Sequence, residues 1–230
     1  MPSIKIEEAI STIKAGNMVI IVDDEDRENE GDLVVAAEKA TPEVLNFMSK
    51  HARGLICVPM MAQRLRELRI PMMVQDNTSR LTTSFTVSVD ALENTTTGIS
   101  AHDRSTTVQT LIDPDSGPDD LARPGHIFPL RYTEGGVLVR AGHTEASVDL
   151  PRMAGMYPAG VLCEIMNDDG SMARMPELEA FSENHDIGIV TIADIINYRR
   201  GHEKLVERVA EARIPTDYGT FDAISYRSIV

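Results

Sequence analysis

Apolar positions follow two periods along the chain, and these periods divide most of it into strands and helices. Short continuous apolar runs predict strands that are covered on both faces, and these predicted strands occupy residues 18–24, 54–60, 160–166 and 187–191. Alternation of apolar and polar residues over 84–91 predicts a strand with one exposed face. The pattern is typical of a protein with a central sheet.

Apolar residues at helical spacing lie between these strands and predict seven helices. The helices cover residues 3–14, 42–53, 62–68, 100–112, the first half of 143–155, 176–186 and 192–200. Ser3 and Ser100 are expected N-caps, and Pro42 suits the first position of a helix. Gly16 and Gly54 are expected to end the first two helices.

Two strand-like segments, 126–132 and 136–142, flank Thr133-Glu134-Gly135-Gly136, and this arrangement predicts a β-hairpin. A hairpin combined with helical crossovers favours an α+β or mixed α/β fold, in which helices pack around a mixed sheet, over a pure doubly wound sheet.

The last thirty residues differ from the rest of the chain. We therefore expect one domain over residues 1–200 and a separate segment over 201–230. This segment begins as a charged helix and ends in an alternating strand over 218–230, for which we find no partner strand.

Composition restricts the class of protein. The chain has 230 residues, 42% of them hydrophobic, and a net charge of −14, which argues against nucleic-acid binding because that needs a basic face. No apolar run approaches the ~20 residues of a membrane span, and the N-terminus lacks the apolar region of a signal peptide. Cys57 and Cys163 could form one disulfide but are too few for a disulfide scaffold. We expect a cytoplasmic protein with no nucleic-acid or membrane partner.

An acidic run, Asp23 to Asp32, lies between two strand-like segments and holds seven carboxylates and Arg27 in ten positions. A solvated loop is the ordinary interpretation of such a run. A hairpin would prefer a tight turn, however, and Gly31 allows a ligand to approach the backbone, so we favour a binding site. Clustered carboxylates relieve their repulsion by binding a cation or sharing protons. An EF-hand is excluded because Asn29 stands where that loop needs Gly.

A second candidate lies where a strand-like segment meets a helix start, at Arg140, Gly142, His143 and Thr144. Free backbone N–H groups, the helix dipole, a guanidinium and a hydroxyl together favour a phosphate. His143 could be a metal ligand or a general base, although a lone His is more often structural.

Three further features carry polar groups at ordered positions. His126 starts a strand after Pro-Gly, and turn formation explains that motif equally well. Glu164 is the one carboxylate of an apolar strand, where burial would raise its pKa for acid/base work unless alternation simply exposes it. Segment 95–107 is rich in hydroxyls around Gly98, and a capped helix is its ordinary interpretation. Together, these residues favour a divalent-metal enzyme acting on a small phosphorylated substrate.

Five motifs occur here in the order found in the 3,4-dihydroxy-2-butanone 4-phosphate synthase family, which the chain resembles over about residues 3–200. The motifs are DDEDRENEGD, TTGISAHDRSTT, RPGHIFPLR, GHTEASVDL and PAGVLCEIMNDDGSMAR. The resemblance implies the α+β fold particular to that family and a homodimer with active sites at the subunit interface. It also implies a lyase of riboflavin biosynthesis that converts D-ribulose 5-phosphate to L-3,4-dihydroxy-2-butanone 4-phosphate and formate.

The resemblance implies a role for individual residues. Glu28 and His143 would hold two divalent ions, Mg²⁺ or Mn²⁺, in each active site. The implied substrate contacts are Arg27, Glu28, Asp32, Arg140, Ala141, Gly142, His143, Thr144 and Glu164. His126 and Glu164 match essential acid/base positions, Asp23 and Glu30 are helpers, and Cys57 matches a pocket cysteine. The reaction passes through a metal-stabilised enediolate, a dehydration and a carbon migration, which explains the number of titratable groups.

The end of the chain has its own resemblance. Residues 206–226 resemble the linker and opening strand of GTP cyclohydrolase II, an enzyme that needs three zinc-binding cysteines. No cysteine follows Cys163. We therefore expect a fragment that lacks this second activity, with a poorly ordered tail.

Two alternatives stay open. Another divalent-metal ketose-phosphate enzyme, an isomerase or aldolase, would use similar groups but would release no formate. A non-catalytic module that binds divalent ions or sugar phosphates would show binding without turnover, and it gives no reason for Glu164 in an apolar strand.

Overall fold

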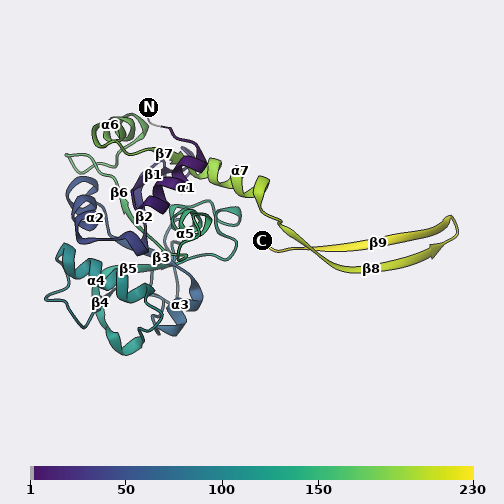
Figure 1. Cartoon of the computed structure of the whole chain (residues 1–230), viewed down its shortest axis with the longest axis horizontal. Coiled ribbons are helices and arrows are strands. Elements are labelled where there is room, and N and C mark those ends of the chain that lie inside the picture. Colours follow the sequence, from purple (N-terminus) through teal and green to yellow (C-terminus); the bar gives the residue numbers. More distant parts are fainter. Residues whose placement is uncertain (1–2) are drawn as a thin grey trace.

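The structure, a computed structural model, describes residues 3–230 and contains a seven-stranded mixed sheet in the order β4-β5-β3-β6-β2-β1-β7 (Figure 1). The strands are β1 Val19–Val22, β2 Gly31–Ala36, β3 Cys57–Met60, β4 Val89–Ala91, β5 Leu121–Arg131, β6 Gly160–Glu164 and β7 Ile189–Thr191. The β1–β7 and β3–β5 pairs are parallel, and the other neighbouring pairs are antiparallel. The predicted mixed sheet is confirmed.

Helices cover both faces of the sheet. They are α1 Ile6–Ala15, α2 Pro42–Phe47, α3 Ala62–Glu67, α4 Ala101–Ile112, α5 His143–Met153, α6 Met175–His185 and α7 Ile192–His202. Within β1, Ile20 and Val22 belong to the core shared with α2, α3, α4 and α6, whereas Val19 and Ile21 belong to the core shared with α1, α5 and α7. Because both faces are covered, the central strands are apolar at most positions, and Asp32 in β2 and Glu164 in β6 are the charged exceptions. None of the helices in residues 3–230 is long and apolar enough to cross a membrane.

Several predicted helix ends are found and others are displaced. The Ser100 hydroxyl accepts a hydrogen bond from the backbone N–H of Asp103 and caps α4, and Gly16 ends α1 with φ 90°. The N-cap of α1 is Lys5 rather than Ser3. Helix α2 continues as a π turn over Met48–Ala52, and Arg53, with φ 74°, ends it in place of Gly54.

The predicted hairpin around 133–136 is wrong. Residues Gly136–Leu138 form a 3-10 turn, and β5 pairs with β3 and β4 instead. Tertiary contacts explain the difference, because the backbone N–H of Val137 donates to Asp149 and Arg199 donates to the carbonyl of Gly135. The predicted strand over 84–91 is shorter than expected, since only Val89–Ala91 is a strand and Phe85 and Thr86 make isolated bridges.

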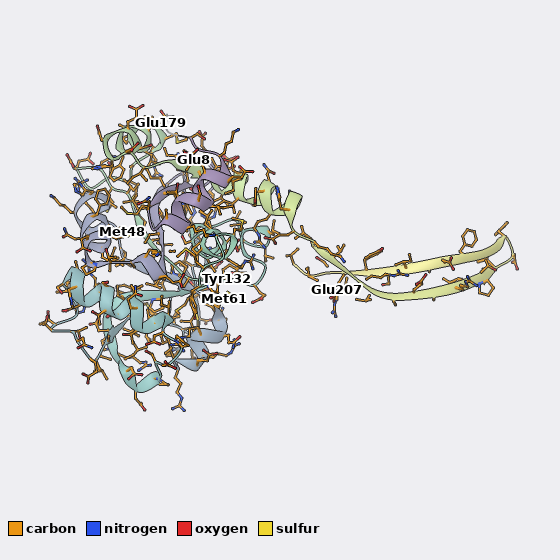
Figure 2. All side chains as sticks on the ribbon, viewed as in Figure 1. Glu8, Met48, Met61, Tyr132, Glu179 and Glu207 are labelled. Atoms are coloured by element: carbon orange, nitrogen blue, oxygen red, sulfur yellow. The ribbon has the colours of Figure 1, made fainter. Side chains whose placement is uncertain are left out.

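The helix predicted after residue 201 is also wrong. Strands β8 (Val206–Thr216) and β9 (Gly219–Ser228) form a separate antiparallel hairpin that extends away from the body (Figure 1). Strand β8 is the partner of β9 that the sequence analysis did not find. Pairing from Val206↔Ser228 to Thr216↔Gly219 favours an extended backbone over the helix that the charged residues predicted. Figure 2 shows the side chains of this hairpin, including Glu207, standing clear of the body that contains Met48 and Tyr132.

Candidate active site

The acidic run connects β1 to β2, which pair from Val19↔Val34 to Val22↔Gly31. Asp23 shapes the loop from within. Its carboxylate accepts hydrogen bonds from Nη1 of Arg27 at 2.8 Å, the backbone N–H of Glu28 at 3.0 Å and the backbone N–H of Glu30 at 2.9 Å. Burial raises the pKa of Asp23, but these donors and the nearby His143 outweigh it and lower the pKa overall. Asp23 therefore stays ionised as the anchor of the loop.

Arg174 holds the same loop from outside, a contact that sequence reasoning missed. Its Nη1 donates to the carbonyl of Glu28 at 2.8 Å and also to the carbonyl of Asn29. The same nitrogen lies 3.8 Å from Oε1 of Glu30. The only sequence signal was the presence of Arg174 in the last of the five motifs.

Glu28 projects from this loop toward the first turn of α5. Oε2 of Glu28 lies 3.8 Å from Nδ1 of His143. Within the chain from residue 3 onward, one group of metal-ligating side chains is found, in which atoms of Asp23, Glu28 and His143 all lie within 4.8 Å of one another. Asp23 is already engaged by three donors, and Oε1 of Glu28 pairs with Nη1 of Arg27 at 2.8 Å, so the free ligand atoms of the described residues in this group are Oε2 of Glu28 and Nε2 of His143.

The residues present fit a divalent cation. His143 is buried, and its Nε2 has no hydrogen-bond partner among the described residues. A buried, unpartnered ring nitrogen is costly unless something binds it. Burial is the main cause that lowers the pKa of His143, so the imidazole is neutral, the form that ligates metals.

Three further carboxylates gather beside this group. Asp32 is paired in register with Glu164 across β2 and β6. Burial, then the charge of Glu164 and the charges of the acidic run, raise the pKa of Asp32 well above its usual value. Burial and the charge of Glu28 likewise raise the pKa of Glu30. Asp32 and Glu30 therefore retain protons more readily than ordinary carboxyls, as groups in acid/base sites do.

Two cavities flank Glu30. One, of about 470 Å³, is lined by Glu30, Glu164, Met166, Met172 and the segment Arg53-Gly54-Leu55. In it, Oε2 of Glu164 accepts a hydrogen bond from the backbone N–H of Leu55 at 2.8 Å. The other cavity, of about 360 Å³, is lined by the acidic run, Ala141 and the starts of α6 and α7.

Two arginines converge on the N-terminus of α5. A Cβ at Gly142, the N-cap, would collide with Nη1 of Arg140 and would lie 2.9 Å from Nη2 of Arg27. Thr144 is buried in the first turn. Glu145 binds Nη1 of Arg140 at 2.7 Å and fixes its guanidinium. Free N–H groups and two guanidiniums at one helix start can bind an anion such as a phosphate.

The structure does not bring His126 into this cluster within one chain. His126 lies on β5, which β3 separates from β6 and Glu164, and it lines neither cavity beside Glu30. Its ring contacts Asp90 instead. Cys57 lies between these strands, where burial and then the charge of Glu164 raise the pKa of its thiol. Both Cys57 and Cys163 are free and buried.

A model of the family described as 3,4-dihydroxy-2-butanone 4-phosphate synthase matches residues 7–198. The chain belongs to this family. The five motifs and all the site residues above lie within the matched range, and the β8–β9 hairpin lies outside it.

Curated relatives support membership of the synthase family. The riboflavin biosynthesis protein RibBA of Endomicrobium trichonymphae is 58% identical over 225 residues, which are 98% of this chain and 56% of that protein. The 3,4-dihydroxy-2-butanone 4-phosphate synthase of Pseudomonas aeruginosa is 57% identical over 225 residues, 98% of this chain and 62% of that protein. The chain spans about half the length of the curated relatives it matches.

Solved structures of the synthase family share the fold. RibBX, a two-domain 3,4-dihydroxy-2-butanone 4-phosphate synthase from A. baumannii, superposes with a TM-score of 0.89 at 49% identity, covering 98% of this chain and 66% of that one. A synthase structure in complex with two magnesium ions superposes with a TM-score of 0.83 at 43% identity, covering 86% of this chain and 98% of that one.

Proposed function

We propose that this chain converts D-ribulose 5-phosphate to L-3,4-dihydroxy-2-butanone 4-phosphate and formate, the activity of its family in riboflavin biosynthesis. One observation carries the proposal: the Glu28–His143 group, the arginine-lined start of α5 and the paired carboxylates Asp32 and Glu164 surround one region of the sheet. A ketose phosphate needs these three kinds of group, for its hydroxyl oxygens, its phosphate and its exchangeable protons.

Glu28 and His143 would hold divalent ions, and we propose two Mg²⁺ or Mn²⁺ ions per site. Support comes from the free Nε2 of His143 and from the family structure that is in complex with two magnesium ions. A divalent ion bound there polarises substrate oxygens and lowers the cost of negative charge on them.

The start of α5 would bind the phosphate. Arg140 and Arg27 supply charge, His143 and Thr144 at the start of α5 supply backbone N–H groups, and Thr144 also supplies a hydroxyl. Glu145 keeps Arg140 in place. In this proposal, a phosphate held there directs the carbonyl end of the sugar toward Glu28 and the β2–β6 carboxylates.

We assign the proton transfers to the carboxylates that gather beside the Glu28–His143 group. Glu164 and Asp32 lie opposite each other at the ends of β6 and β2, and Glu30 lines the same cavity as Glu164. A carboxylate takes a proton from a carbon next to a carbonyl and returns it to an oxygen. Asp23 serves this chemistry by holding the loop that carries Glu28 and Glu30.

We also propose a homodimer with the active site at its interface. His126 matches an essential acid/base position, yet in one chain it lies two strands from Glu164. The exposed apolar side chains of Leu55, Met73 and Val74 are candidates for the surface that a partner would cover.

Residues 201–230 are proposed to be separate from the synthase domain of residues 1–200. Their strands β8 and β9 form their own sheet, outside the range that the family model matches. The cytoplasmic location stays a prediction, and three plant relatives are named as chloroplastic.

The direct test is proton NMR of the chain with ribulose 5-phosphate and Mg²⁺. We expect stoichiometric formate, no formate after EDTA, and recovery when Mg²⁺ or Mn²⁺ is added back. An isomerase would instead yield another pentose phosphate and an aldolase would yield shorter sugars. Absence of formate, or formate that is insensitive to EDTA, would refute the proposal.

A further inference from the structure

The ring of His126 is held by one carboxylate in two places. Oδ2 of Asp90 lies 2.7 Å from Nδ1 of His126, and Oδ1 of Asp90 accepts the backbone N–H of the same residue at 2.9 Å. The Asp90 side chain is 12% exposed and that of His126 is 41% exposed. Asp90 is therefore largely covered, whereas the His126 ring is accessible to a reactant.

This geometry determines where the ring proton lies. An ionised carboxylate can only accept hydrogen bonds, so Nδ1 of His126 must carry the proton that it shares with Asp90. The other nitrogen, Nε2, makes no hydrogen bond to any group in residues 3–230 and has its lone pair free. A carboxylate that fixes the tautomer of a His in this way makes Nε2 available to exchange protons with a substrate.

An irregularity in the sheet brings Asp90 to His126. The register of β4 against β5 shifts between Val89 and Asp90, so Val89 pairs with Ile127 whereas Asp90 pairs with Ala122. The extra residues of β5 bulge, and the hydroxyl of Ser88 accepts the backbone N–H of Gly125 within the bulge. Bulges of this kind reorient a side chain beside a functional site.

The hydroxyl-rich segment before α4 covers the pair. Gly98, with φ 93°, approaches so closely that a Cβ there would collide with Oδ2 of Asp90 and would lie 2.6 Å from Nδ1 of His126. The loop is tied to the start of α4, because Oδ2 of Asp103 accepts from the Thr96 hydroxyl at 2.8 Å and from the backbone N–H of Gly98 at 3.0 Å.

We propose that Asp90 is a positioning residue for His126 and that the loop Thr95 to Ser100 seals the Asp90–His126 contact from water. The motif TTGIS thereby gains a function beyond capping α4. This inference rests on the proposed function, in which His126 transfers protons. The inference adds two points to that function: the tautomer of His126 is fixed, and Asp90 is the residue that fixes it.

The test compares Asp90→Asn with Ser88→Ala in the 230-residue chain. Ser88→Ala is the matched control because it removes a hydrogen bond of the same bulge without touching the His126 ring. Long-range ¹H–¹⁵N NMR reads the protonated ring nitrogen, and His126→Gln assigns its signals. Formate release gives kcat and KM, and Asp90→Glu tests whether a carboxylate restores activity.

We expect Nδ1 of His126 to be protonated in the unmodified chain and in Ser88→Ala, and to lose the proton to Nε2 in Asp90→Asn. Turnover in Asp90→Asn should fall by about 10²–10⁴-fold with KM within twofold, as for loss of a general acid or base. Asp90→Glu should recover part of that loss.

A ring protonated at Nε2 in the unmodified chain would overturn the inference without any variant. Turnover of Asp90→Asn equal to that of Ser88→Ala would overturn it too. Absence of formate from the unmodified chain would instead refute the proposed function, and the NMR result would then still decide whether Asp90 fixes the tautomer.

Discussion

Replacing Arg199 by Met breaks a buried ion pair whose partners the structure defines. The Arg199 side chain is 2% exposed, and its Nη1 donates to Oδ2 of Asp149 at 2.7 Å and to the carbonyl of Gly135 at 2.9 Å. Asp149 is fully buried and also accepts from the Tyr132 hydroxyl at 2.8 Å and the Val137 N–H at 2.9 Å. This cluster joins α7 to α5 and to the turn before α5.

Met keeps much of the volume of Arg199 but leaves the Asp149 charge with mainly neutral donors. Removing one partner of a buried pair costs about 3–5 kcal/mol. Two neutral donors remain, and Arg152 lies 3.3 Å from the Asp149 carboxylate. We therefore expect the free energy of unfolding to fall by about 3 kcal/mol, the lower end of that range. A loss of 1 kcal/mol lowers Tm by about 2–4 °C in a domain of this size, so Tm should fall by roughly 6–12 °C.

Urea unfolding followed by circular dichroism measures the free energy of unfolding of Arg199→Met, and Tm gives a second measurement. Arg152→Met is the matched control, because Arg152 contacts the same carboxylate but is 40% exposed. An exposed pair contributes about 0–1 kcal/mol, so the control should change little. Asp149→Asn in the Arg199→Met background should recover part of the loss by removing the unpaired charge. Equal losses in the two arginine variants would refute the reasoning.

Four further results are expected. Glu28→Gln should abolish formate release and leave Tm within about 2 °C, since Glu28 is proposed as a metal ligand and lies only partly buried outside the core; a large fall in Tm would assign it a structural role. Arg140→Ala should raise KM about tenfold or more through loss of a charged hydrogen bond of about 1.5–3 kcal/mol, and an unchanged KM in formate kinetics would remove the phosphate assignment. Burial raises the pKa of the Cys57 and Cys163 thiols, so both stay protonated at pH 8, and mass spectrometry should find iodoacetamide adducts only in urea; labelling of the native chain would contradict this. A chain ending at Glu203 should keep the Tm and turnover of the full chain, because β8 and β9 form a separate sheet, and loss of either would show that the hairpin supports the domain.

Local patterns predicted the elements that local interactions determine. The apolar runs that become β1, β3 and β6 are buried at every position except Glu164, so burial on both faces selects the strand. The Ser100 cap was likewise predictable, since its hydrogen bond spans only three residues. The acidic run and the turn at 140–144 were each recognisable as binding segments. Together they favoured a divalent-metal enzyme for a phosphorylated substrate, but only the resemblance to the synthase family singled out Glu28 and His143 as the pair of metal ligands.

Elements that depend on distant partners were not predictable. Hydrogen bonds with Asp149 and Arg199, which are 12 and 64 residues from their partners in the turn after Tyr132, replace the expected hairpin. Asp90 looks like any polar residue of an alternating strand, and its contact with His126 exists only because of the β4–β5 bulge. Arg174 contacts the acidic loop although 146 residues separate it from Glu28 along the chain.

The loop that carries Glu28 has a consequence for the rate and strength of ion binding. Asp23 and Arg174 fix its backbone through hydrogen bonds that involve no cation. Fixing a free residue costs about 1–2 kcal/mol in conformational entropy, and here folding has already met that cost. Affinity for an arriving ion is therefore undiminished by ordering of the loop. Mg²⁺ loses its water slowly, so exchange of that water should set the association rate.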